Sequence, residues 1–181
     1  MLKRLLPFLL LSATQTFADG RADLIHVLET AGRHAYEDER REVEVNGCQM
    51  TTYRWRDRPE HGWVLWTSFQ FDMADAQLNE DKRFPGKKYA YAKLNDEPEE
   101  IGIVILGFTM REGTQTRQER SILRDPSGDT TPSPRGDGNS HYFQWRSYML
   151  ITMTGTDVEE RAIAFTSSYD QYVKEYCSFS S

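Results

Sequence analysis

The fold is decided by residues 41–55, which read REVEVNGCQMTTYRW. Two valines alternate with two glutamates before Asn46-Gly47, and a second alternating run follows. Asn-Gly between alternating runs predicts a β-hairpin with a two-residue type I′ turn, because both turn residues must adopt positive φ. In that register Val45 lies opposite Cys48, and both valines share a sheet face with Met50. We therefore expect Cys48 to point toward the core.

Four later segments predict further strands. Residues 62–72 and 141–153 alternate along their length, and residues 101–110 form a continuous apolar run that is typical of a buried strand. Residues 114–124 are more polar, which favours an edge strand. Together with the hairpin, these segments indicate an antiparallel sheet of about five or six strands.

Helices are predicted at both ends of the domain. Apolar residues at three- and four-residue spacing indicate a helix over residues 22–36. Near the other end, Thr156 and Glu159 match a capping box, and an apolar stripe continues to Tyr176. We expect an α+β fold in which the N-terminal and C-terminal helices pack on one face of the antiparallel sheet.

Cys48 and Cys177 are the two cysteines of the chain. An even pair that is far apart in sequence, without Cys-x-x-Cys spacing, predicts a structural disulfide rather than a redox or metal site. The bond would close a loop of about 130 residues and stabilise the fold by roughly 4 to 5 kcal/mol in the loop-entropy model. It would also hold the last helix against the first hairpin.

The N-terminus has the three parts of a secretory signal peptide, which we place at residues 1–18. Lys3 and Arg4 are followed by the apolar stretch 5–13, and Thr16-Phe17-Ala18 offers a small-x-small cleavage site before Asp19. The apolar stretch is too short to span a bilayer. We therefore expect a periplasmic or secreted protein consisting of a single domain, residues 19–181.

The composition limits the partners. The predicted signal carries two of the 22 Lys and Arg residues, which leaves 20 against 28 Asp and Glu in the mature chain. An acidic domain repels nucleic acid and anionic lipid. We expect no nucleic-acid partner and no membrane span, and the sequence carries no signal for an oligomeric state.

Two segments have the composition of long connecting loops. Residues 79–88 are dominated by charge, and residues 125–140 are rich in Pro, Gly, Ser, Thr and Asp. We expect both to be exposed and flexible. Loops of this length are uncommon in small domains unless they bind a partner or remain disordered.

The sequence contains few candidates for a catalytic or metal-binding site. The chain contains no nucleophile elbow, phosphate-binding loop or zinc-binding helix motif, and its four histidines are scattered. We therefore expect no metal and no cofactor. Asp72 and Asp75 could serve as a general acid and base together with His141, so a small extracytoplasmic hydrolase is an alternative function.

Aromatic residues on the predicted strands are the better candidates for a binding site. On an uncovered sheet face they would offer a large contact area to a sugar, a lipid or a protein; alternatively, they fill the second side of a closed barrel or sandwich. The candidate residues are Tyr53, Trp55, Trp66, Tyr142 and Tyr148.

These observations favour an exported, non-enzymatic binding domain that acts on a protein or another envelope component. Besides the hydrolase, the alternative is a carrier of an apolar ligand or a sugar. A carrier would hold its ligand inside a barrel or on the aromatic sheet face.

Overall fold

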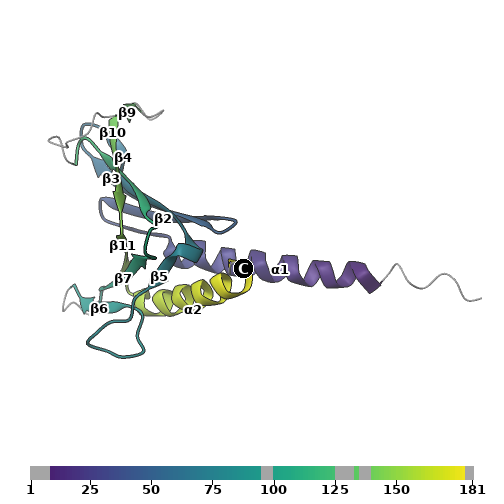
Figure 1. Ribbon diagram of the computed structural model, residues 1–181. Coiled ribbons are helices and arrows are strands. Elements are labelled where there is room, and N and C mark those ends of the chain that lie inside the picture. Colours follow the sequence, from purple (N-terminus) through teal and green to yellow (C-terminus); the bar gives the residue numbers. More distant parts are fainter. Residues whose placement is uncertain (1–8, 95–99, 125–132, 135–139, 178–181) are drawn as a thin grey trace, which may run out of the picture.

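The computed structural model describes residues 9–94, 100–124, 133–134 and 140–177. Two α-helices are the first and last elements of the described chain, and antiparallel strands and one short 3₁₀ helix, η1, lie between them in sequence (Figure 1). In chain order the elements are α1 (Leu9–Gly32), β1 (His34–Tyr36), β2 (Glu39–Asn46), β3 (Gln49–Arg58), β4 (Gly62–Asp72), η1 (Met73–Asp75), β5 (Ala76–Leu78), β6 (Ala90–Lys93), β7 (Gly102–Met110), β8 (Thr116–Ser121), β9 (Ser133–Pro134), β10 (Ser140–Arg146), β11 (Tyr148–Gly155) and α2 (Val158–Tyr176).

The α+β class, the antiparallel pairing and the two terminal helices are confirmed. The strands form a seven-stranded main sheet, in the order β1-β2-β3-β4-β8-β10-β9, and a small sheet in the order β11-β7-β5 with β6 paired to β7. α1 and α2 pack side by side, and β9 and β10 lie at the end of the main sheet farthest from them (Figure 1). The helices therefore cover only part of the main sheet.

The predicted strand over residues 141–153 is divided at Ser147. Its first part, β10, pairs with β8 in the main sheet, and its second part, β11, pairs with β7 in the small sheet. Strands that change sheets at a bend are a common way to build the corner between two sheets. Ser147 therefore marks the junction between the two sheets.

The hairpin is present, but its register differs from the prediction. Val45 lies opposite Met50 rather than Cys48, and Gly47 with Cys48 forms the turn. Only Gly47 has positive φ, at 61°, so the turn places its glycine first. The partner of Val45 has shifted by two residues, which preserves the face. Both valines and Met50 are accordingly buried together, as predicted.

The predicted helix boundaries are wrong at three places. α1 begins at Leu9 rather than at residue 22, and it ends at Gly32 instead of Tyr36, because residues 34–36 pair with β2 as an edge strand. A Cβ at Gly32 would lie 2.3 Å from Cγ2 of Val43, so this close approach of helix to sheet requires glycine. At α2 the predicted capping box is not formed. Asp157 is the N-cap, and its side chain makes no capping hydrogen bond.

The core lies between the helices and the two sheets. Tyr169 and Tyr172 of α2 are fully buried, yet each hydroxyl has a partner. The Tyr169 hydroxyl donates to the carbonyl oxygens of Met73 and Ala76, at 3.1 and 2.9 Å. The Tyr172 hydroxyl donates to the carbonyl oxygen of Gly47, at 2.7 Å. These bonds fix α2 to the hairpin turn and to the segment that joins the two sheets.

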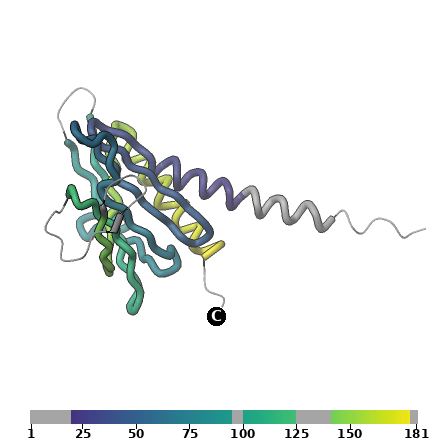
Figure 2. The backbone as a smooth tube through the Cα atoms, turned by 90° about the horizontal axis from the view of Figure 1, so that it is seen from above, coloured from purple at the N-terminus to yellow at the C-terminus, as the bar shows by residue number. Residues whose placement is uncertain are grey.

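The predicted disulfide between Cys48 and Cys177 is present, with 5.5 Å between the Cα atoms. Figure 2 shows the tip of the β2–β3 hairpin over the end of α2, where this bond lies. The last helix is therefore held to the first hairpin, as the sequence indicated. Within the described part of the chain, no helix has both the length and the apolar character needed to cross a membrane.

Candidate functional site

The aromatic residues predicted to form one binding face are separated by a β-bulge. Arg54 of β3 lies opposite Thr67 of β4, but the next residue, Trp55, lies opposite Leu65, which leaves Trp66 as the extra residue. The guanidinium carbon of Arg58 lies 4.4 Å from the centre of the Trp66 ring. Side chains alternate along β3, so Trp66 shares the face of Arg58 and not that of Trp55.

Tyr53 and Trp55 remain together on the outer face of the main sheet, away from the helices. Their ring centres are 6.4 Å apart in a stacked arrangement. The guanidinium carbon of Arg40 lies 5.2 Å from the ring centre of Trp55 and 5.1 Å from that of Trp63. The Tyr53 hydroxyl donates to Glu44. This face therefore carries aromatic side chains in contact with charged ones, and it is not an open apolar surface.

The two remaining candidates lie elsewhere. Tyr142 on β10 is buried, with 5% of its surface exposed, and it pairs with Arg120 across the inner face of the main sheet. Tyr148 is the first residue of β11 and is 58% exposed. The structure therefore places the five predicted residues in different surroundings and does not bring them together as one site.

Five arginines converge on a pocket at the junction of the two sheets. The pocket has a volume of about 310 Å³ and lies between the inner face of the main sheet and β11. We call it the arginine pocket. Its lining consists of Arg41, Arg54, Thr67, Phe69, Gln118, Arg120, Arg124, Arg146, Tyr148, Met149, Leu150 and Thr152.

Strand register explains why these arginines meet. Arg41 pairs with Arg54, Arg54 with Thr67, and Thr67 with Arg120, which places all four residues in one row across four neighbouring strands. Directly paired residues of antiparallel strands point to the same face. Gly32, the last residue of α1, packs against the next row, so the arginine row begins where the helix ends.

One carboxylate is shared among three arginines beside the pocket. Glu39 accepts hydrogen bonds from Arg41 and Arg54, both at 2.5 Å, and from Arg56 at 3.2 Å. Burial alone would raise the pKa of Glu39, but the Arg41 and Arg54 guanidiniums outweigh it and lower the pKa. Burial lowers the pKa of Arg41 to about 10, although Glu39 opposes this change. Positive charge is therefore concentrated in a poorly solvated place.

Arg146 adds a cation on the other side of the pocket. Its Nε donates to Oε1 of Gln118 at 3.1 Å, and its terminal nitrogen donates to Oε1 of Gln144 at 2.5 Å. Both amides are neutral, so these two bonds orient the guanidinium without cancelling its charge. Arginine side chains held in this way bind carboxylates and phosphates through paired hydrogen bonds.

The lining of the arginine pocket suits binding better than proton transfer. The lining residues include no His, Cys, Asp or Glu, and arginine stays protonated near neutral pH. Within the part of the chain that the structure describes, no group of three or more His, Cys, Asp and Glu residues could hold a metal ion. The pocket can orient an anion, but it offers no general base to activate water.

The residues of the alternative hydrolase site are not gathered. The Asp72 carboxylate accepts from the backbone N–H of Ala74 and caps η1, while Asp75 lies 3.9 Å from Arg111. His141 is fully buried, with Nδ1 3.6 Å from Glu119. Along the strands, Asp72 and His141 are separated by about six residue levels, or roughly 20 Å.

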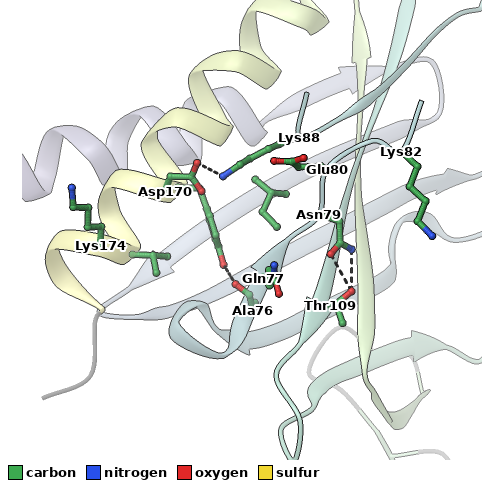
Figure 3. A pocket seen from close by; sticks show the side chains of 12 residues that line it. Ala76, Gln77, Asn79, Glu80, Lys82, Lys88, Thr109, Asp170 and Lys174 are labelled. Atoms are coloured by element: carbon green, nitrogen blue, oxygen red, sulfur yellow. Dashed lines mark hydrogen bonds and ion pairs between the residues drawn. The ribbon is translucent and has the colours of Figure 1, made fainter. Parts of the chain in front are cut away.

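A larger cleft of about 950 Å³ lies between α2, β5 and the loop after β5 (Figure 3). Four of its polar side chains pair with one another. Lys88 forms an ion pair with Asp170, and Asn79 exchanges hydrogen bonds with Thr109. Lys82 and Lys174 lie at opposite ends of the cleft (Figure 3). The cleft therefore has no single point on which several cations converge.

The two predicted loops have different outcomes. Residues 79–88 are mostly exposed, as expected, and several of them border the larger cleft. Of the predicted loop 125–140, residues 125–132 and 135–139 lie outside the described residues. Between them, β9 pairs with β10 at the end of the main sheet.

The sequence reasoning missed the arginine pocket, although a signal was present. Arg41 lies two residues before Val43 on the first predicted hairpin strand, and Arg54 lies four residues after Met50 on the second. Alternation therefore places both arginines on the core face. Charged residues on a core face are rarely left without a partner, which marks the position as unusual.

No protein-family model, curated protein or solved structure matches this chain. In the arginine pocket, five cations and several apolar side chains meet around a space of ligand size, since ligand pockets start at about 300 Å³.

Proposed function

We propose that the protein is an exported, non-enzymatic binding domain that holds the anionic group of a ligand in the arginine pocket. The observation that carries the proposal is the convergence of five arginines on one pocket in a chain with a formal net charge of −6. In an acidic protein, random placement would disperse cations among acidic partners. Here Arg41 and Arg54 share the Glu39 carboxylate with Arg56, which lies outside the pocket lining, and Arg146 is oriented by neutral amides.

The physical basis is the desolvation of the arginines. Burial weakens the hold of Arg41 on its proton, as its lowered pKa shows. An anion that enters the pocket compensates the positive charge that water no longer stabilises there. A hydrogen bond to a charged group is worth about 1.5 to 3 kcal/mol, so two or three such bonds suffice for selective binding of a small anion.

Export is supported by chemistry at both ends of the domain. The signal-like segment ends at Ala18, and the Cys48–Cys177 disulfide is of the kind that persists in an oxidising compartment. We propose that the mature chain begins at Asp19 and works in the periplasm or outside the cell. N-terminal sequencing of the protein expressed with its own leader tests this, and an intact Met1 on protein from the periplasm or medium would contradict it.

The binding proposal is tested by titrating the protein with sodium butanoate, followed by the NMR signals of the arginine Nε–H groups. The charge variant is Arg146→Gln, because the partners shown for Arg146 are neutral amides and no carboxylate shown in contact with it loses a partner. The control is Arg117→Gln, which removes an arginine from the opposite face of the same sheet.

We expect the butanoate-dependent shifts to centre on Arg54 and Arg146. Loss of one charge-assisted contact should weaken binding by about tenfold or more in Arg146→Gln, whereas Arg117→Gln should bind like the wild type. Shifts that avoid the pocket, or equal weakening by the two variants, would show that the arginine pocket is not the binding site.

A further inference from the structure

An exposed apolar strip continues the arginine pocket along the outer face of the small sheet. Tyr148 and Leu150 line the pocket and are 58% and 51% exposed. Thr152, also in the lining, pairs with Ile105, which is 37% exposed, and Ile105 pairs on its other side with Ala90. Paired residues point to the same face. We call Tyr148, Leu150, Ile105 and Ala90 the apolar strip.

The strip is open to a ligand at its centre. Gly107 lies opposite Leu150 and has no side chain to cover the flank of that leucine. A Cβ at Gly107 would lie 3.8 Å from Cδ2 of Leu150, which is ordinary contact distance. The backbone there consequently forms a shallow floor between the exposed Leu150 and the side chain of Asn79, whose Nδ2 would lie 3.5 Å from the same Cβ.

We infer that the ligand is a single-chain anionic amphiphile, such as an alkyl carboxylate, whose head group binds the arginines and whose chain lies on the apolar strip. This inference rests on the proposed function, because it assigns the chemical class of the ligand at the same site. Exposed apolar patches beside polar groups are typical of binding surfaces. Here the two chemistries share Tyr148 and Leu150 as lining residues.

The size of the pocket agrees with a ligand whose head group lies inside the pocket and whose chain lies on the apolar strip. At about 310 Å³ the pocket is at the lower limit of ligand sites, so it encloses a head group and the first carbons of a chain. The remaining carbons then contact Leu150, Ile105 and Ala90 on the open sheet face. Each methylene removed from water raises affinity by up to about fourfold.

The test is calorimetric titration at constant salt with butanoate, with dodecanoate below its micelle concentration, and with dodecyl maltoside as a neutral head group on the same chain. The strip variant is Leu150→Gln. Its matched control is Ile163→Gln on α2, because Ile163 is 53% exposed and does not line the pocket. Arg146→Gln reports on the head-group contact.

We expect dodecanoate to bind at least about tenfold more tightly than butanoate, since chain methylenes leave water. Leu150→Gln should weaken dodecanoate binding about threefold or more and butanoate binding by less, because only the first carbons of butanoate reach Leu150, whereas Ile163→Gln should match the wild type. Dodecyl maltoside should bind much more weakly than dodecanoate.

The same measurements distinguish a failure of the amphiphile inference from a failure of the proposed anion binding. If butanoate and dodecanoate bind equally and Arg146→Gln weakens both, the amphiphile inference is wrong and anion binding stands. Equal weakening of dodecanoate by the Leu150 and Ile163 variants would also overturn the inference, because adsorption would then be nonspecific. If dodecyl maltoside binds as tightly as dodecanoate, head-group recognition fails, and the proposed function fails with it.

Discussion

The inner face of the main sheet has two ends with opposite chemistry. At the end covered by the helices, Val43, Met50 and Phe71 are buried against α1 and α2. One row further along the same strands, Arg41 and Arg54 occupy equivalent positions on the same face. The difference lies in what covers each end, because α1 ends at Gly32 beside Val43. The covered end stabilises the fold, and the uncovered end is available to a ligand.

At the covered end, the disulfide is expected to make the largest contribution to the free energy of unfolding. Cys48 and Cys177 are separated by 129 residues in sequence and join the hairpin turn to the end of α2. Reduction, or the double variant Cys48→Ser with Cys177→Ser, should lower the free energy of unfolding by roughly 4 to 5 kcal/mol. Urea denaturation of the oxidised and reduced protein measures this change.

The double serine variant separates the bond from side effects of the reductant. Adding reductant to it should produce no further change. Equal unfolding free energies for the oxidised and reduced wild-type protein would show that the disulfide does not hold the covered end.

A somewhat smaller effect is expected from the core beneath the helices. Phe165 of α2 is fully buried and stacks near Tyr169, with 6.4 Å between ring centres. Phe165→Ala should lower the free energy of unfolding by about 3 to 5 kcal/mol, because it removes apolar contacts and leaves a cavity. Chemical denaturation gives the value, and Ile163→Ala on the exposed side of α2 is the control.

Affinity for dodecanoate should not change in Phe165→Ala under conditions where the variant is folded, because Phe165 does not line the arginine pocket. A parallel loss of affinity and stability would contradict the separation of the two ends.

The sequence predicted the covered end better than the uncovered end. The alternation around Val43 and Met50 survives even a shift of strand register, because a shift of two residues preserves the face. The disulfide followed from the presence of two cysteines in a chain with a predicted signal peptide. These features depend on local pattern or on simple chemistry.

The uncovered end depends on features that local pattern does not encode. The bulge at Trp66 reverses the alternation of β4, and the bend at Ser147 moves β11 into another sheet. The first separated Trp66 from Trp55, and the second carried Tyr148 to the arginine pocket. Four strands must also be in register before Arg41, Arg54 and Arg120 form one row, and pairing between distant strands is not visible in a single segment.

The smallest effect on stability is expected from Glu39 at the uncovered end. Its pKa is lowered in the folded protein, so the unfolded chain binds the proton more readily. The stability that ionised Glu39 contributes is present above the ordinary value of 4.5 and is lost as the pH falls through the lowered pKa. Glu39→Gln should therefore destabilise the protein modestly at pH 7, and the difference from the wild type should shrink as the pH falls below 4.5, as measured by urea denaturation.

Glu39→Gln should also tighten the binding of butanoate at pH 7, because it removes the carboxylate that competes for Arg41 and Arg54. The control Glu42→Gln changes a carboxylate on the outer face of the same strand, beside Arg40. Weaker butanoate binding in Glu39→Gln would mean that Glu39 prepares the site rather than competing with the anion.

The most direct test of the division between the two ends is the dissociation constant for dodecanoate in Arg146→Gln, measured beside its free energy of unfolding. The account predicts affinity lower by about tenfold or more while the variant is fully folded, with a loss of stability no larger than about 1.5 to 3 kcal/mol, because Arg146 gives up its hydrogen bonds to Gln118 and Gln144. Unchanged affinity, or a loss of affinity that appears only as the variant unfolds, would contradict the assignment of the uncovered end to binding.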